Sequence, residues 1–126
     1  MQILIADDHK GVRENLRALL AEQQPSWELS EAENGKEAVE IFRKEAPDIT
    51  VLDIVMEPMG GVAAAYEIRQ IDPNAKIIFI SGHYAPGDAA WIARLLGAKA
   101  FVPKPEAVKL LVPTINRVLN EQRPLV

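Results

Sequence analysis

Short apolar runs alternate along the whole chain with segments of helical periodicity, and this alternation constrains the fold more than any other feature. Four of the runs are nearly continuous and rich in β-branched or aromatic residues, as in strands that are covered on both faces. These runs occupy residues 3–6, 49–53, 76–81 and 99–103, and a more alternating run at 27–33 is typical of an edge strand. The pattern predicts five successive βα units.

Between the runs, hydrophobic residues recur at the spacing of one helix face. The helical sets are Val12, Leu16, Leu19 and Leu20; Ala38, Ile41 and Phe42; Ala64, Ile68 and Ile71; Trp91, Ile92, Leu95 and Leu96; and Val108, Leu111, Ile115, Val118 and Leu119. Because parallel neighbours need right-handed crossovers, we predict a doubly wound α/β fold with one parallel sheet. We interpret Trp27 and Trp91 as packing residues, and Pro113 should kink or interrupt the last helix unless that helix restarts there.

Size and composition restrict the classes of function. The chain has 126 residues, 48% of them hydrophobic and 25% charged, which is typical of one globular domain. A net charge of -4 gives no basic surface for nucleic acid, and the apolar runs are too short for a signal peptide or a membrane helix. The absence of cysteine excludes disulfides and thiolate sites. We therefore expect a cytoplasmic protein that by itself binds neither nucleic acid nor membrane.

In open parallel sheets ligands bind beyond the carboxyl ends of the strands, so the residues there are candidates for a site. The first strand is predicted to end at Asp7 and Asp8, the third at Asp53, the fourth at Ser81 and the fifth near Lys104. The three carboxylates suit a hard cation such as Mg²⁺, and adjacent like charges need a positive partner. A carboxylate beside the ion can attack phosphorus, and Lys104 and Ser81 can stabilise the transferring oxygens.

Each of these residues also has a structural interpretation. Asp7 and Asp8 suit a solvated strand end and a helix N-cap, and taken alone the cap is as good an interpretation as the metal site. Asp53 is also able to cap a helix, but its apolar neighbours on both sides favour a functional role. Lys104, between two prolines, is an ordinary exposed turn residue when taken alone.

Taken together, these residues resemble the receiver domain of the bacterial two-component response regulators over essentially the whole chain. The matching segments are "DDH" at 7–9, "DIVMEPMGG" at 53–61, "SGH" at 81–83 and "FVPKP" at 101–105. The resemblance implies a flavodoxin-like strand order 2-1-3-4-5, a receiver domain at 1–121, and a tail or cut linker at 122–126. It further implies a signalling domain that catalyses only its own phosphorylation and dephosphorylation.

The resemblance also assigns the chemistry of the site. Asp53 becomes the phosphoacceptor for a sensor histidine kinase or a phosphotransfer protein, and the product is an aspartyl phosphate. Mg²⁺ is implied as the cofactor, bound directly by Asp8, mainly through water by Asp7, and also by Asp53. The main-chain carbonyl of Val55 completes the implied metal ligands.

Ser81 and Lys104 are implied to contact the phosphoryl oxygens, and a cis Lys104-Pro105 bond would turn the lysine inward. Phe101, by default a half-buried strand aromatic, is implied to change rotamer with Ser81 and so to switch the output face at 85–121. Val55 and His83 flank the implied entry of attacking water, and we hypothesise that the apolar Val55 lengthens the life of the phosphorylated form.

The sequence departs from the receiver pattern in one loop, and other functions are also considered. Glu57 separates Met56 from Pro58, where the family often has Met-Pro, so the shape of this loop is open. An aspartyl-phosphate phosphatase would need a second acid where Val55 stands, and a phosphorylation-independent interaction module would need no chemistry at all. Homodimerisation on phosphorylation is left open, as is a stand-alone receiver against the N-terminal domain of a larger regulator. The opening of the chain most resembles receivers that precede a helix-turn-helix output domain, which would lie outside this sequence.

Overall fold

Five parallel strands form one sheet in the order β2-β1-β3-β4-β5, which confirms the predicted fold class and strand order. The computed structural model describes residues 1–82 and 86–121. In chain order the elements are β1 (Gln2–Ala6), α1 (Lys10–Gln23), β2 (Glu28–Ala32), α2 (Gly35–Glu45), β3 (Ile49–Asp53), α3 (Gly61–Ile71), β4 (Ile77–Ser81), α4 (Pro86–Leu95), β5 (Ala100–Pro103), the 3₁₀ turn η1 (Lys104–Glu106) and α5 (Ala107–Asn120). The alternating strand is at one edge of the sheet, as predicted.

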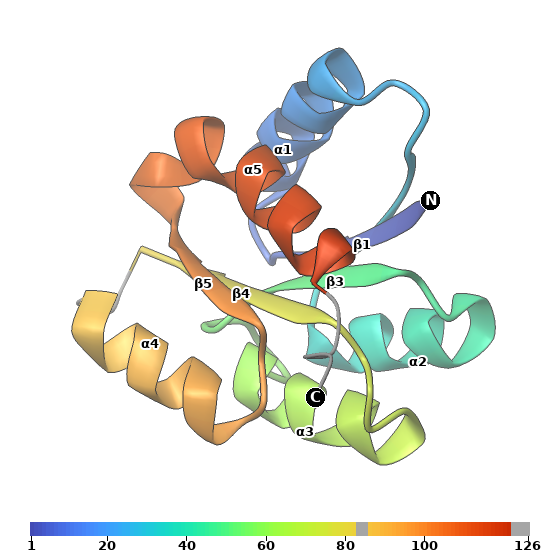
Figure 1. Cartoon of the computed structure of the whole chain (residues 1–126). Coiled ribbons are helices and arrows are strands. Elements are labelled where there is room, and N and C mark those ends of the chain that lie inside the picture. The colour runs from blue at the N-terminus through green and yellow to red at the C-terminus, as the bar shows by residue number, and fades with distance from the viewer. Residues whose placement is uncertain (83–85, 122–126) are drawn as a thin grey trace, which may run out of the picture.

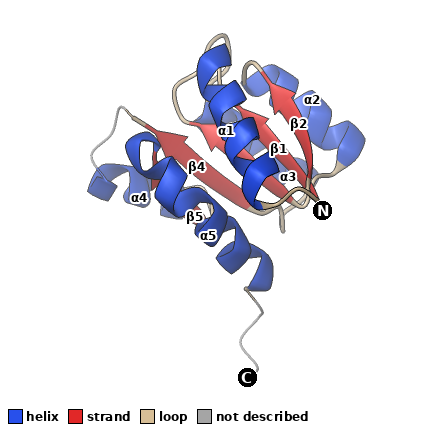
Figure 2. Cartoon of the chain, turned by 90° about the horizontal axis from the view of Figure 1, so that it is seen from above, coloured by secondary structure: helices blue, strands red, loops and turns tan. Residues whose placement is uncertain are grey.

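The helices cover both faces of the sheet, so strands β1, β3 and β4 are buried on two sides. Along β1, Ile3 and Ile5 pack in one cluster with α1 and α5, while Leu4 and Ala6 pack in the other with α2 and α3. Figure 1 shows α1 and α5 on one side of the sheet and α2, α3 and α4 on the other. Figure 2, turned by 90°, shows α1 and α5 lying across the strands. Double coverage explains why the strands have continuous apolar runs.

The prediction that Trp91 is a packing residue is wrong. Its exposed fraction is 60%, and that of Leu95, one helical turn later, is 69%. Within α4 the small residue Ala93 is buried instead, so the larger apolar side chains form an outer stripe. Trp27 is partly buried and packs against the α1 and α5 cluster, which confirms its packing role.

Helix α5 continues through Pro113, so the predicted interruption does not occur. Proline lacks the N–H that would bond to the carbonyl four residues earlier. Pro113 is exposed, whereas Leu111, Val112 and Ile115 around it are buried in the core. Packing of this apolar face holds the helix together despite the missing hydrogen bond. Among the described residues, no helix has the length and apolar character needed to span a membrane.

Candidate functional site

The register of the sheet brings the predicted site residues together at the carboxyl ends of the strands. Strands β1 and β3 are neighbours in register, which sets Asp7, directly after β1, beside Asp53 at the end of β3. Strand β4 lies on the other side of β3 and ends at Ser81, whose register partner is the last residue of β5. Lys104 follows that residue directly. We call this group of strand ends, with Asp8, the acidic rim.

Lys104 bridges two buried carboxylates. Its Nζ lies 2.9 Å from Asp7 Oδ2 and 2.8 Å from Asp53 Oδ2. Asp7 is 0% exposed and Asp53 is 1% exposed, while 19% of the Lys104 side chain is exposed. Carboxylates this deeply buried need a counter-charge, and Lys104 supplies it. The lysine is therefore no ordinary exposed turn residue.

The pKa values of this pair are shifted in the directions that burial and charge dictate. Burial raises the pKa of Asp53 above its ordinary value of 3.8, the hydrogen bond from Lys104 opposes that shift, and the charge of Asp7 adds to it. Burial alone would lower the pKa of Lys104. Its hydrogen bonds and charge interactions with the two carboxylates outweigh burial and hold that pKa above 10.5. The ammonium is charged at neutral pH.

The capping interpretations of the aspartates are wrong. The N-cap of α1 is His9, and the N-cap of α3 is Gly60. Asp7 Oδ1 accepts a hydrogen bond from the His9 N–H at 2.8 Å, which closes a tight loop after β1 rather than a helix end. Asp53 Oδ1 accepts a weaker bond from the Val55 N–H at 3.3 Å. These carboxylates therefore bind the backbone of the loops that follow β1 and β3.

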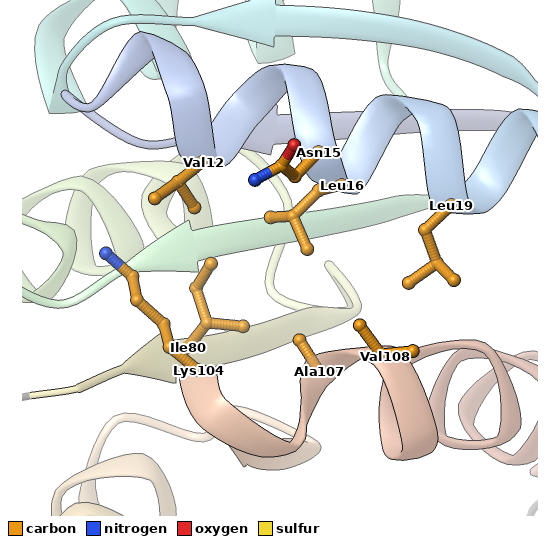
Figure 3. A pocket seen from close by; sticks show the side chains of 8 residues that line it. All are labelled: Val12, Asn15, Leu16, Leu19, Ile80, Lys104, Ala107 and Val108. Carbon is orange, nitrogen blue, oxygen red and sulfur yellow. The ribbon is translucent and has the colours of Figure 1, made fainter.

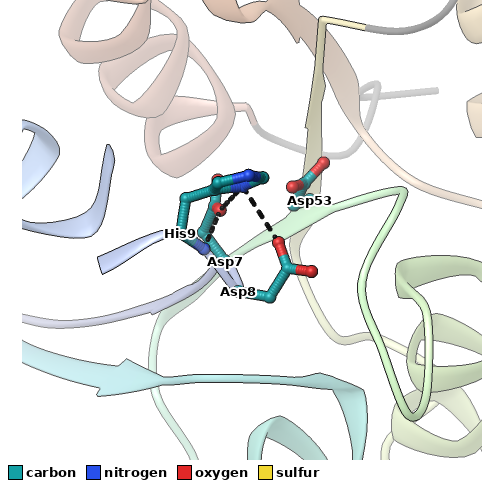
Figure 4. Close-up of side chains that lie close together, drawn as sticks. All are labelled: Asp7, Asp8, His9 and Asp53. Atoms are coloured by element: carbon teal, nitrogen blue, oxygen red, sulfur yellow. Dashed lines mark hydrogen bonds and ion pairs between the residues drawn. The ribbon is translucent and has the colours of Figure 1, made fainter. Parts of the chain in front are cut away.

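Asp7, Asp8, His9 and Asp53 each offer one potential metal-ligand atom, and these atoms all lie within 4.8 Å of one another. Figure 4 shows the four side chains converging, with His9 reaching toward both neighbouring aspartates. His9 Nδ1 lies 3.1 Å from Asp8 Oδ1 and 3.4 Å from Asp7 Oδ1. The sequence favours a solvent-facing residue at the entry to a helix for His9, and the structure agrees: His9 is the N-cap of α1, and its side chain is 65% exposed. Because three of the four groups are carboxylates, the cluster is compatible with Mg²⁺.

The remaining predicted residues differ in their positions. Ser81 is 1% exposed at the end of β4, and Phe101 is half-buried in β5 against the α2, α3 and α4 side of the core. Val55 is 40% exposed. His83 lies outside the described residues. All the described members of the predicted set except Phe101 gather at or next to the rim.

The loop after β3 passes close to the backbone of the rim. A side chain at Gly61 would collide with the main-chain carbonyl of Asp53, so only glycine fits there. The Gly61 N–H donates to the Ile54 carbonyl at 2.9 Å. The cis peptide bond among the described residues is Glu57-Pro58, so the implied cis bond at Lys104-Pro105 is wrong. Lys104 nevertheless points inward.

A largely apolar groove leads away from the rim between α1 and α5, with a volume of about 190 Å³. Figure 3 shows Lys104 at one end of this groove, with its amine pointing away from the α5 side chains. The lining residues are Val12, Asn15, Leu16, Leu19, Ile80, Lys104, Ala107 and Val108. The stem of Lys104 is thus part of an apolar wall, while its charge faces the aspartates.

Comparisons with known proteins agree with this geometry. The family model described as the response regulator receiver domain matches residues 3–116. The chain is similar to the chemotaxis protein CheY of Thermotoga maritima, with 39% identity over 120 residues, 93% of this chain and 96% of that protein. It is also similar to the transcriptional regulatory protein DegU of Brevibacillus brevis, with 31% identity over 121 residues, 94% of this chain and 50% of that protein.

A solved structure extends the comparison to three dimensions. The crystal structure of a LuxR-family two-component response regulator from Aurantimonas sp. SI85-9A1 has a TM-score of 0.87 to this chain and 34% identity, covering 97% of this chain and 86% of that chain. The parallel sheet and its acidic rim therefore have the architecture of a signalling module rather than of a conventional enzyme. The chain belongs to the response regulator receiver domain family.

Proposed function

We propose that this chain is a phosphoryl-accepting switch in a two-component phosphorelay and that Asp53 is the phosphoacceptor. The observation that carries the proposal is the contact of Lys104 Nζ with both Asp53 and Asp7 in a buried rim. A purely structural site would gain little from two carboxylates at 0% and 1% exposure sharing one lysine. Membership of the receiver family supports the same chemistry.

In the proposed reaction an Asp53 carboxylate oxygen attacks phosphorus, a new P–O bond forms, and the bond to the donor breaks. The attacking group must be ionised, and Lys104 favours that form against the effect of burial. As the carboxylate charge moves onto the phosphoryl oxygens, the same ammonium remains within reach of them. Ser81, also at the rim, is proposed to donate its hydroxyl proton to another phosphoryl oxygen.

Asp7, Asp8, Asp53 and the main-chain carbonyl of Val55 are proposed to hold Mg²⁺. When bound, the ion neutralises charge on the phosphoryl oxygens. Asp7 Oδ2 supports this role, because it is buried and its described partner is a cation, the Lys104 ammonium at 2.9 Å. A buried carboxylate oxygen is suited to a cation, since desolvated charge needs compensation.

The signal is proposed to leave the rim through Ser81 and Phe101. Ser81 ends β4, and Phe101 of β5 is the register partner of Phe79 of β4, so the two residues lie on paired strands. The predicted output face at 85–121 includes the exposed stripe of Trp91 and Leu95. Phosphorylation would shift the population between two arrangements of this face. Homodimerisation through this face stays a prediction.

A sensor histidine kinase is the proposed phosphodonor. The relatives include a protein of similar length and one that is twice as long, so both a stand-alone receiver and a receiver with an output domain have counterparts. The prediction of a DNA-binding output domain beyond this sequence is supported by the likeness to a transcriptional regulator and to a LuxR-family regulator.

The direct test is intact mass after incubation with acetyl phosphate, with and without Mg²⁺. We expect one phosphoryl adduct on the wild type, dependent on Mg²⁺ and absent from Asp53→Asn. Asp88→Asn, which changes an exposed aspartate in the first turn of α4, should retain the adduct. No adduct on the wild type would contradict the proposal and favour an interaction module. Turnover of an unrelated phosphomonoester would instead favour a phosphatase.

A further inference from the structure

Arg13 is a buried cation that the proposed phosphotransfer does not use. It lies in the first turn of α1 and is 8% exposed. Its Nη1 donates a buried hydrogen bond of 2.7 Å to the main-chain carbonyl of Asp7. Arginine is rarely buried without a specific partner. Its partner here is the backbone of the loop that carries two of the proposed metal ligands.

The bonded carbonyl controls the orientation of the next residue. The carbonyl of Asp7 and the N–H of Asp8 belong to one planar peptide unit. A hydrogen bond that fixes the carbonyl therefore also fixes the orientation of the Asp8 N–H and restricts the direction of the Asp8 side chain. On the other side, the Asp7 N–H donates to the Ala32 carbonyl at 3.1 Å. Asp7 is thus held at both of its peptide units, whereas Asp8 is exposed and its carboxylate lies 3.1 Å from His9 Nδ1.

Arg13 is itself fixed by an ion pair. Its Nε lies 3.3 Å from Glu31 Oε1 in β2, and the other oxygen of Glu31 lies 2.7 Å from Arg17 Nη1. A guanidinium is planar and donates in several directions at once, so it can bind the carbonyl and the carboxylate together. Arg17 contacts the same glutamate, but its side chain is 54% exposed.

We propose that Arg13 is a positioning residue for the metal site, because its bond to the Asp7 carbonyl aims the Asp8 carboxylate at the position between Asp7 and Asp53. This inference rests on the proposed function, since it assumes that the acidic rim binds Mg²⁺. Groups that orient metal ligands from outside contribute about 10- to 100-fold to metal affinity.

The test is the dissociation constant for Mg²⁺ of the unphosphorylated protein, measured by isothermal titration calorimetry. Arg13→Met should bind Mg²⁺ about tenfold more weakly than the wild type. Charge alone predicts the opposite, because loss of a cation near an acidic site favours cation binding. Arg17→Met removes the same charge from the same helix and is the matched control, and its affinity should stay within about twofold of the wild type.

Thermal unfolding of each variant separates positioning from folding, because a general loss of stability leaves the affinity of the folded fraction unchanged. If Arg13→Met does not fold, Arg13→Lys replaces it: the charge is kept, but one amine cannot hold both partners, so weaker binding is still expected. A folded Arg13 variant with wild-type affinity would overturn the inference alone. A wild type that binds no Mg²⁺ would overturn the proposed metal site and the inference with it.

Discussion

Two basic side chains, Lys104 and Arg69, each link neighbouring elements, but they lie at opposite ends of the strands and their partners differ in kind. We call these ends of the sheet the carboxyl edge and the amino edge. At the carboxyl edge, Lys104 contacts two carboxylates. At the amino edge, Arg69 of α3 donates to the main-chain carbonyls of Leu96 at 3.0 Å and Pro73 at 3.2 Å. The carbonyls are neutral at every pH, whereas the carboxylates change charge with protons, metal and phosphate. The comparison teaches that one edge is built to respond and the other to stay fixed.

At the amino edge, Arg69 packs closely against Gly97. Gly97 has a φ of 72°, in the left-handed region, and a side chain there would collide with Arg69 Nη1. The arginine thus occupies the space that the glycine leaves open. At the carboxyl edge, Lys104 keeps 19% of its side chain exposed, so solutes can reach it. Function and stability should therefore respond differently to changes at the two edges.

The largest expected difference is in phosphorylation. Lys104→Met should slow adduct formation from acetyl phosphate by about 10²- to 10³-fold, because the transition state loses a preorganised cation. The rate of adduct formation in Arg69→Met should stay within about threefold of the wild-type rate, since the partners of Arg69 lie at the amino edge. Initial rates by intact mass at saturating Mg²⁺ measure both. Equal losses in the two variants would break the distinction between a responsive and a fixed edge.

The next effect is on stability at the fixed edge. Gly97→Ala should lower the free energy of unfolding by about 3 kcal/mol, since a positive φ costs about 1 to 2 kcal/mol and the displaced Arg69 loses hydrogen bonds worth about as much again. In an Arg69→Met background the same change should cost only about 1 to 2 kcal/mol. Urea unfolding of the four proteins completes the cycle. Additive costs would show that Arg69 and Gly97 are not coupled.

A smaller effect is the pH dependence of stability without metal. Because the folded pKa of Asp53 is raised, the folded state holds this proton more tightly than the unfolded chain. Wild-type stability should therefore fall as pH rises from 3.8 toward the folded pKa. The pKa of Lys104 is also raised, so its interactions stabilise the folded state fully below pH 10.5. That stabilisation is lost only as the pH rises through the folded pKa of Lys104.

Asp53→Asn has a neutral amide in place of the buried carboxylate. In EDTA at pH 7 its free energy of unfolding should therefore exceed that of the wild type by about 1 kcal/mol. Its advantage should shrink toward pH 4. Arg69→Met should run parallel to the wild type across this range, because its lost partners do not titrate. Urea unfolding at a series of pH values measures all three. Parallel curves for Asp53→Asn and the wild type would contradict the assigned burial of this carboxylate.

The smallest expected effect concerns the lifetime of the phosphorylated form. Val55 is 40% exposed beside the rim, and its apolar side chain offers nothing to orient an attacking water. Val55→Asn should shorten the half-life of the adduct by about threefold to tenfold. The change is followed by intact mass after removal of acetyl phosphate. An unchanged half-life would show that Val55 does not tune this rate.

The sequence predicted the strands and their ends well, because parallel strands covered on both faces leave long apolar runs that stop where charge begins. Asp7, Asp53, Ser81 and Lys104 followed from that rule, and the register of the sheet brings them together. The sequence alone did not reject the cap interpretation of Asp7, because only three residues separate the end of β1 from the start of α1.

Other features depended on tertiary contacts that have no local signal. Trp91 has the spacing of a core residue, yet the short helix α4 buries Ala93 instead. Pro113 breaks an isolated helix, but buried neighbours on α5 keep this one intact. Arg13 appears as an ordinary charged helix residue, and only the fold shows its bond to the loop after β1. Side chains that act on backbone from another element are the hardest to predict.

The central claim is that phosphate is accepted on Asp53, and borohydride trapping tests it at residue level. An acyl phosphate is reduced by borohydride to an alcohol, so a phosphorylated aspartate becomes homoserine. After incubation with acetyl phosphate and Mg²⁺, peptide sequencing by mass spectrometry should find homoserine at position 53 and none when Mg²⁺ is omitted. Homoserine at Asp7 or Asp8, or at no position, would contradict the account.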